Sequence, residues 1–146
     1  MAVMGQIRGG SGGTESAFKD YVKAMASKGS FSFADAGYNR GTVNESYLNV
    51  DTTNKYVYLY CDFTMTASLS ANADILYSGS GVPSCMPSGS SGTISNYIAT
   101  EKNGTASSGS TMKFSYYTSG TKIGILSNSS VSSGDRYVVY MAWQYA

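Results

Sequence analysis

Residues 55–66 constrain the fold of this chain more than any other segment. Apolar side chains alternate there with tyrosines and polar side chains, with a period of two. Successive side chains of a strand point to opposite faces of its sheet, so this period predicts a strand. One face is expected to be core, and it carries Val57, Leu59, Cys61, Phe63 and Met65. The opposite face carries three tyrosines and two polar residues, which are Tyr56, Tyr58, Tyr60, Asp62 and Thr64.

The same period of two recurs after residue 30, beginning with Phe31 and Phe33. Further segments predicted as strands are 42–50, 74–78, 93–100, 111–118, 122–127 and 136–145. Asn103-Gly104 predicts a tight hairpin, and Ser119-Gly120 predicts a second tight turn. Short strands at intervals of roughly ten residues are typical of a sandwich. We therefore predict an all-β, jelly-roll-like antiparallel β-sandwich.

One segment with a helical period precedes the strands. Its apolar side chains recur at spacings of three and four residues: Phe18, Tyr21, Val22 and Met25. Thr14 is the expected N-cap and Gly29 the expected C-terminal stop, so we predict one short helix over 14–29. A helix of this length is marginal alone and must pack its apolar stripe on something. It either covers an open end or edge of the β domain or packs against its own copies in an oligomer.

Glycines dominate residues 9–13, which predicts a flexible N-terminal segment over 1–13, either a natural hinge or an added linker. The chain is therefore divided into this segment, the helix at 14–29 and one β-sandwich head domain at 30–146. The first eight residues contain no apolar region of the kind that a secretory signal needs. We therefore expect synthesis in the cytoplasm without a signal peptide.

The last predicted strand, 136–145, is apolar on both faces. Strands of that kind lie in the middle of a structure, so its second face is expected to meet something beyond its own core. The row of tyrosines on residues 56–60 is likewise too apolar for a plain solvent-facing surface. Together these two features predict a homo-oligomer. The predicted interface residues are Tyr56, Tyr58, Tyr60, Trp143 and Tyr145.

Charge and composition argue against several classes of function. The 146 residues include no histidine, which is the commonest general base and metal ligand. Ten Lys and Arg against nine Asp and Glu leave a net charge of +1, which argues against a partner that is bound through its phosphates. No apolar run approaches the roughly 18 residues of a membrane span. We therefore expect no nucleic-acid partner, no membrane insertion, no metal and no cofactor.

Few residues could carry covalent or acid–base chemistry. Cys61 lies in a strongly apolar strand and is expected to be a buried free thiol, whereas Cys85 lies in a Gly/Ser/Pro loop. A bridge between the two cysteines is the alternative. The nine carboxylates are scattered, and their spacing does not indicate a glycosidase-like pair. We therefore expect that the chain is not an enzyme.

The loops are rich in Tyr, Ser, Gly and Asn, which is typical of adaptable recognition surfaces. Tyrosine rings can stack on sugar rings while amides and carboxylates bond the sugar hydroxyls. Plain hydrophilic loops are an equal interpretation. Asp135-Arg136 could grip a ligand hydroxyl, and a local ion pair explains the same two residues. The candidate ligand-binding residues, chosen from their loop positions, are Tyr97, Asn103, Tyr117, Asp135 and Arg136.

The order of segments in residues 42–146 resembles that of a known family. A strand at 56–66, a Pro-containing loop, an Asn-Gly hairpin, the segment 123–127, a Ser-rich loop and an aromatic closing strand at 137–145 follow in turn. This order is similar to that of the C-terminal head domains of tail-fibre and baseplate proteins from phages of Gram-positive bacteria. The resemblance implies a jelly-roll-like sandwich, a homotrimer and binding of host cell-wall saccharides. It also implies a place in the virion beside other tail proteins, and it transfers no individual binding residue.

We therefore expect non-catalytic, multivalent binding of a host cell-surface saccharide at a phage tail fibre or baseplate. A structural virion or capsid-decoration protein without a ligand would have the same fold and is the first alternative. A saccharide hydrolase is the more remote alternative, because it needs two carboxyl groups about 5–10 Å apart in a cleft.

Overall fold

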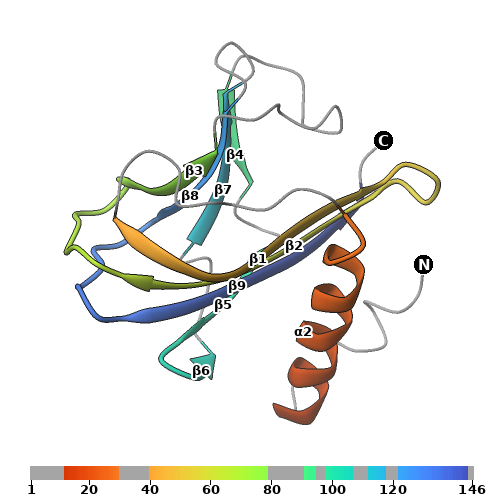
Figure 1. Cartoon of the computed structure of the whole chain (residues 1–146), viewed down its shortest axis with the longest axis horizontal. Coiled ribbons are helices and arrows are strands. Elements are labelled where there is room, and N and C mark those ends of the chain that lie inside the picture. The colour runs from red at the N-terminus through yellow and green to blue at the C-terminus, as the bar shows by residue number, and fades with distance from the viewer. Residues whose placement is uncertain are drawn as a thin grey trace.

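The computed structural model describes residues 12–29, 40–78, 91–94, 98–106, 112–117 and 122–144. Within these residues the chain forms one α-helix and nine β-strands (Figure 1). The helix α2 spans Gly12–Ala26. The strands are β1 (Gly41–Asp51), β2 (Tyr56–Met65), β3 (Asp74–Ser78), β4 (Ser91–Ile94), β5 (Ile98–Lys102), β6 (Thr105–Ala106), β7 (Met112–Tyr117), β8 (Lys122–Ser127) and β9 (Arg136–Gln144).

The strands form two antiparallel sheets that pack against each other. The first sheet has the order β1-β2-β9-β5-β6, and the second has the order β3-β8-β7-β4. Early strands pair with late ones in both sheets, β2 with β9 and β3 with β8, so the two halves of the chain interleave. The predicted all-β, jelly-roll-like antiparallel sandwich with one short helix is confirmed.

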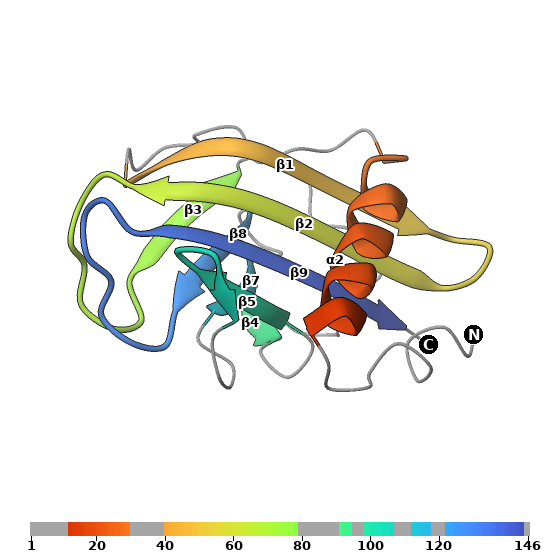
Figure 2. The ribbon, with the colours of Figure 1, turned by 90° about the horizontal axis from the view of Figure 1, so that it is seen from below.

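Helix α2 adds a third layer. It lies on the face of the first sheet that is turned away from the second sheet (Figures 1 and 2). It crosses β1, β2 and β9 and contacts all three strands. The helix thus covers part of the β domain, but it covers a sheet face rather than the open end or edge that the sequence suggested.

The helix begins earlier than the expected range of 14–29. Its first residue is Gly12, so Thr14 lies inside the first turn instead of capping it. The first N–H groups of a helix have no intrahelical partner, which is why glycines are tolerated there and the composition did not mark the start. Of the expected flexible segment 1–13, the last two residues are helical, and 1–11 lie outside the described residues.

Within the described part of the chain, no helix is long and apolar enough to cross a membrane.

Gly29 follows the helix for a reason other than the expected C-terminal stop. The described glycines with a positive φ are Gly104 and Gly134, so Gly29 does not adopt the left-handed conformation of such a stop. A Cβ atom on Gly29 would overlap the carbonyl oxygen of Leu48 and lie 2.7 Å from Cα of Asn49. Glycine is required because the chain passes directly against the backbone of β1.

The inner core lies between the two sheets. From β2 it takes the whole face that was predicted as core, which is Val57, Leu59, Cys61, Phe63 and Met65. The second sheet contributes Ile75, Leu76, Met112, Phe114 and Ile125. The division of β2 into one core face and one opposite face, predicted from the period of two, is therefore confirmed.

Cys61 is a free, buried thiol, as predicted. Burial raises the pKa of this thiol above its ordinary value, so the sulfur stays protonated at neutral pH. Cys85 lies outside the described residues.

Strand β9 is apolar on both faces because it lies between two layers and between two strands, β2 and β5. The residues toward the second sheet are Tyr137, Val139 and Met141, and those toward α2 are Val138, Tyr140 and Ala142. The second apolar face of β9 therefore meets the helix of the same chain.

The predicted strand boundaries hold for most segments and fail for one. The ranges of β3 and β8 match the predictions of 74–78 and 122–127. The predicted hairpin is confirmed, because Asn103 and Gly104 have φ angles of 51° and 84°, the two positive values that a type I′ turn needs. The single strand predicted at 93–100 is wrong, since β4 and β5 belong to different sheets. The segment around Phe31 and Phe33 and the turn at 119–120 lie outside the described residues.

Candidate functional site

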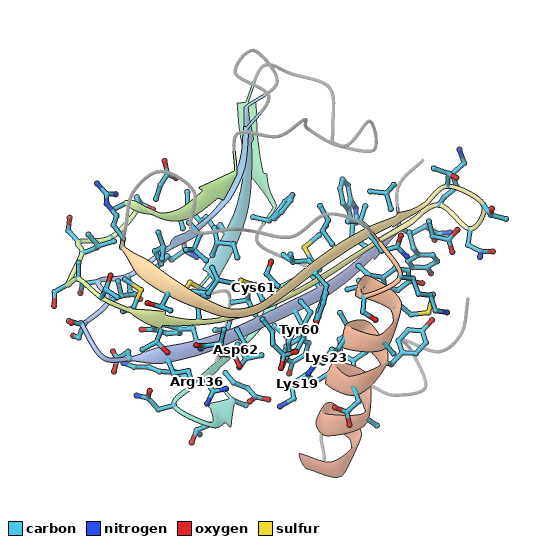
Figure 3. All side chains as sticks on the ribbon, in the orientation of Figure 1. Lys19, Lys23, Tyr60, Cys61, Asp62 and Arg136 are labelled. Atoms are coloured by element: carbon cyan, nitrogen blue, oxygen red, sulfur yellow. The ribbon has the colours of Figure 1, made fainter. Side chains whose placement is uncertain are left out.

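The outer face is the face of the first sheet that carries α2. Along β2 this face changes from apolar to polar, with three tyrosines toward Tyr56 and then Asp62 and Thr64. The helix covers the tyrosines, and the polar end lies beyond it (Figure 3). Figure 3 labels side chains that mark this change: Lys19, Lys23, Tyr60, Asp62 and Arg136.

Five sheet residues under α2 form a surface that we call the tyrosine face: Tyr56, Tyr58, Tyr60, Tyr140 and Ala142. All five are less than 8% exposed, and Val22 and Ala26 of the helix are fully buried against them. The rings of Tyr56 and Tyr58 are stacked with centroids 5.7 Å apart. The ring of Tyr21 on the helix meets that of Tyr58 edge to face at 6.1 Å. These contacts seat the helix through aromatic geometry as well as through buried area.

The expected role of Tyr56, Tyr58 and Tyr60 in an oligomer interface is corrected by this packing. All three side chains are buried under the helix of their own chain, so they do not present an open surface to a second copy. The alternating pattern showed that the face needs an apolar partner. It did not show that residues 12–29 supply that partner.

Burial affects the ionisation of two residues of the tyrosine face, Tyr58 and Tyr60. Burial raises the pKa of Tyr58 above its ordinary value, and a hydrogen bond with Tyr21 acts in the same direction. Burial also raises the pKa of Tyr60, against an opposing effect of Lys23, whose Nζ lies 5.1 Å from the centroid of the Tyr60 ring. Both phenols are therefore neutral over the physiological pH range.

Two ion pairs, which we call the helix clamps, hold α2 to strands on both sides of the tyrosine face. Lys19 Nζ lies 2.9 Å from Glu101 Oε2 on β5. Lys23 Nζ lies 2.8 Å from Glu45 Oε2 on β1, and the hydrogen bond to Glu45 raises the pKa of Lys23. The two lysines are one helical turn apart, so they lie on the same side of α2 and reach opposite sides of the sheet.

Beyond the helix, the outer face carries a group of hydrogen-bonded residues that we call the polar cluster: Asn44, Asp62, Asn103, Asp135 and Arg136. Its centre is a bidentate pair in which Arg136 donates from Nε to Asp62 Oδ1 (2.9 Å) and from Nη2 to Asp62 Oδ2 (2.5 Å). Asn44 Nδ2 donates to the same Oδ1 at 3.0 Å. The bond from Arg136 lowers the pKa of Asp62 and outweighs the opposing effect of burial.

The β5–β6 hairpin joins this cluster through Asn103. The Asn103 side chain accepts a bond from Arg136 N (2.8 Å) through Oδ1 and donates from Nδ2 to Asp135 Oδ1 (3.1 Å). That second bond lowers the pKa of Asp135, and Lys102 Nζ lies 3.5 Å from Asp135 Oδ2. Asn103 N also donates to the carbonyl oxygen of Arg136 at 2.8 Å, so the backbone and the side chain of this turn residue both hold the hairpin to the start of β9.

Three of the five candidate ligand-binding residues come together in the polar cluster: Asn103, Asp135 and Arg136. Tyr117 ends β7 in the second sheet, where only its backbone is described, and Tyr97 lies outside the described residues. The local ion pair considered between Asp135 and Arg136 is wrong, because each residue pairs with another side chain. Arg136 pairs with Asp62, and Asp135 pairs with Lys102 and Asn103.

The two candidate interface residues of the last strand are Trp143 and Tyr145. Trp143 is half-buried and packs against the inner core, toward the second sheet rather than toward α2. Tyr145 lies outside the described residues.

Sequence reasoning missed the roles of Asp62 and Asn44. Asp62 has a side chain only 5% exposed within a strand that is otherwise largely apolar. A buried carboxylate needs a counter-charge and hydrogen bonds, so Asp62 could have been identified as a residue that requires a cation. Nothing in its position on β2 identified that cation as Arg136, which is 74 residues away in sequence.

The described carboxylates of the outer face under and beside α2 are paired with cations. Glu45, Asp62 and Glu101 each contact a lysine or arginine. At Asp62 the bond from Arg136 lowers the pKa and so favours the ionised carboxylate, whereas a general acid must hold a proton near neutral pH. Among the described residues, no group of three acidic or cysteine side chains is placed to hold a metal ion.

No family model, no curated protein and no solved structure matches this chain.

Proposed function

We propose that this chain is a non-catalytic binding module for a host cell-surface saccharide, carried on the tail fibre or baseplate of a phage. The order of strands and loops that resembles phage head domains supports the setting. The sandwich fold is compatible with it. The chemistry of the polar cluster supports the class of ligand.

One observation carries the proposal, namely that the guanidinium of Arg136 is both exposed and held in place. Its side chain is 59% exposed, yet its position is fixed by two bonds to Asp62, whose side chain is only 5% exposed. A guanidinium has five N–H donors, and Asp62 occupies two of them. Within the described part of the chain, three donors therefore remain for hydroxyl or carboxylate groups of a ligand. A donor that is already fixed loses little side-chain entropy when it binds.

Affinity in this proposal comes from several copies. Each hydrogen bond to a sugar replaces a bond to water and contributes about 0.5–1.5 kcal/mol. A few such bonds give weak binding at one site. A homotrimer, which the family resemblance implies, would amplify binding by roughly 10²–10⁴ where the geometry allows simultaneous contacts.

A structural virion protein without a ligand is the second candidate. The observation in its favour is that members of the polar cluster bond to one another, as in Asn103 to Asp135 and Arg136 to Asp62. A network of this kind can fix a hairpin against a strand without any further role.

A glycan array that includes bacterial wall polymers, probed with the purified full chain, tests the proposal. Arg136→Lys keeps a cation beside Asp62 but replaces the five fixed N–H donors of the guanidinium with the three of an ammonium and loses the bidentate geometry, so it should reduce glycan binding, and the melting temperature measured beside it reports the cost of the weakened ion pair. Asn54→Ala is the matched control. It removes a bond of 2.9 Å to Asp51 at the β1–β2 turn, at the opposite end of the same sheet, and should leave binding unchanged. If the wild-type chain binds no wall glycan while intact particles adsorb to cells, the structural candidate replaces this proposal.

A further inference from the structure

We propose that Asn103 is a modification site of this chain, where water converts the side-chain amide into a carboxylate at a rate that the polar cluster controls. The nucleophile is the backbone nitrogen of Gly104, and water is the co-reactant. This inference is independent of the saccharide proposal, because it concerns the chemistry of the β5–β6 turn and holds whether or not the polar cluster binds a ligand.

The sequence and the turn geometry favour this reaction at Asn103. Residues 103–104 are the one Asn-Gly pair in the chain. An asparagine side chain is attacked most readily by the next backbone nitrogen where that next residue has no Cβ to shield it. Around Gly104, which has a φ of 84°, the position that a Cβ would occupy has no atom of a non-adjacent residue within 4 Å. Both turn residues are exposed, so water can reach them.

The reaction balances without an oxidant or a reductant. Gly104 N bonds to Cγ of Asn103 and gives up its proton, the bond from Cγ to Nδ2 breaks, and Nδ2 leaves with that proton as ammonia. Water then opens the resulting cyclic imide at one of its two carbonyl carbons. Opening at Cγ gives aspartate, and opening at the main-chain carbonyl carbon gives isoaspartate, in which the chain continues through the side chain. One amide and one water thus become one carboxylic acid and one ammonia.

Three hydrogen bonds hold Asn103 in the folded chain. Its Oδ1 accepts from Arg136 N at 2.8 Å, and its Nδ2 donates to Asp135 Oδ1 at 3.1 Å. Its backbone N donates to the carbonyl oxygen of Arg136 at 2.8 Å. Ring closure requires the amide to rotate toward Gly104 N, and this rotation breaks both side-chain bonds. The polar cluster therefore slows the reaction, and its local opening controls the rate.

Either product disturbs the contact between the hairpin and β9. Aspartate places a negative oxygen where Nδ2 donated to Asp135, and two carboxylates at hydrogen-bond distance repel each other. Isoaspartate adds a main-chain atom to a two-residue turn, whose type I′ geometry matches the pairing of Lys102 with Thr105. Conversion of Asn103 is therefore expected to loosen the β5–β6 hairpin from the start of β9.

Uptake of heavy oxygen from labelled water tests the modification. The full chain is incubated in water enriched in ¹⁸O at slightly alkaline pH, folded or in urea, and then digested with trypsin in ordinary water. Cleavage after Lys102 and Lys113 releases the peptide 103–113, and the peptide 41–55 is the internal reference, since side-chain-bearing residues follow all of its asparagines. We expect label at Asn103 in both states, with faster uptake in urea. Uptake in urea no faster than in the reference peptide would overturn the proposal.

Control of the rate by the polar cluster is tested in the folded chain. Asp135→Ala removes the acceptor of the Nδ2 bond and should speed conversion of Asn103 roughly tenfold, the factor that loss of one hydrogen bond to a charged group corresponds to. Asp51→Ala is the matched control, because it also removes a carboxylate that accepts from an asparagine side chain, Asn54 Nδ2 at 2.9 Å. It should leave the rate at Asn103 unchanged. Equal rates for Asp135→Ala and wild type would show that the cluster does not control the reaction.

The structural consequence is tested with Asn103→Asp, which reproduces one of the two products. Hydrogen exchange followed by NMR reports the backbone N–H at position 103, which donates to the carbonyl oxygen of Arg136 in the wild type. We expect this N–H to exchange several times faster in the variant, while the N–H groups that pair β2 with β9 keep their wild-type rates. Unchanged exchange at position 103 would show that conversion leaves the hairpin attached, and this step of the proposal would be wrong.

Discussion

Replacing Gly29 by alanine should destabilise the chain, because the new Cβ would overlap the backbone of β1 at Leu48. The contact is with backbone atoms, which cannot rotate away, so the helix or the strand must move. Overpacking of this kind costs about 1–3 kcal/mol. Alanine also reduces the entropy of the unfolded chain, which offsets about 0.4–1 kcal/mol of that cost. We expect a net loss of about 1–2 kcal/mol, or about 2–8 °C in melting temperature for a chain of this size.

Two further substitutions make this test specific. Gly41→Ala is the matched control on β1, because its Cβ would lie 3.4 Å from the nearest atom, the Thr64 carbonyl oxygen, an ordinary contact. Gly29→Asn distinguishes a need for glycine caused by the close contact with β1 from one caused by a left-handed backbone. Asn tolerates a left-handed conformation, but its side chain is larger than that of alanine. Urea unfolding followed by the fluorescence of Trp143 gives the free energies. If Gly29→Asn is as stable as wild type, or Gly29→Ala is no less stable than Gly41→Ala, the close-approach argument is refuted.

Three other predictions concern the sandwich and the polar cluster. Thr100 Oγ1 is buried without a hydrogen-bond partner in the described part of the chain, so Thr100→Val should raise the free energy of unfolding by about 1 kcal/mol in the same urea assay, and a decrease would indicate a bonded hydroxyl. The lowered pKa of Asp62 means that its ion pair stabilises the fold fully above its unfolded pKa, near 3.8, and that this contribution is lost as the pH falls through the lower folded value. Asp62→Asn should therefore be less stable than wild type at pH 7, with a gap that narrows below about pH 4, and a gap that is constant with pH would contradict the assignment. The Cys61 thiol, which is buried and has a raised pKa, should react with a thiol reagent only at the rate of unfolding, and fast labelling of the native chain at this residue would show that the inner core is open.

The parts of the fold that could be predicted are those encoded by local patterns. The two faces of β2 follow from a period of two, and the Asn103-Gly104 turn follows from the residues that tolerate positive φ. The break between β4 and β5 could not be found this way, because a segment that changes sheet keeps the same alternation in both sheets. The position of α2 on the first sheet could not be predicted from the sequence either. An amphipathic helix shows that it packs on something, and only the folded chain shows on what.

The candidate site could likewise be predicted only in part. Asn103, Asp135 and Arg136 were chosen from loop positions, and hairpin and strand geometry brings them together. Their partners could not be predicted, because the pairing of Arg136 with Asp62 rather than with neighbouring Asp135 depends on the register between β2 and β9. In that register Arg136 stands opposite Thr64, which places its guanidinium beside Asp62 on the same face.

The few charged residues of this chain lie where burial of apolar side chains alone does not determine which sheet face α2 packs on. Both faces of β2 are apolar over the length of the tyrosines, so burial alone does not decide which face receives α2. Only 13% of the residues are charged, yet two ion pairs join α2 to the first sheet and a third joins β2 to β9 within that sheet. Exposed pairs such as the helix clamps stabilise a fold by at most about 1 kcal/mol each. A helix placed on the inner face would instead strand Lys19 and Lys23 in an apolar layer without their carboxylates, at a cost of several kcal/mol per ion. The clamps therefore act chiefly against the wrong arrangement.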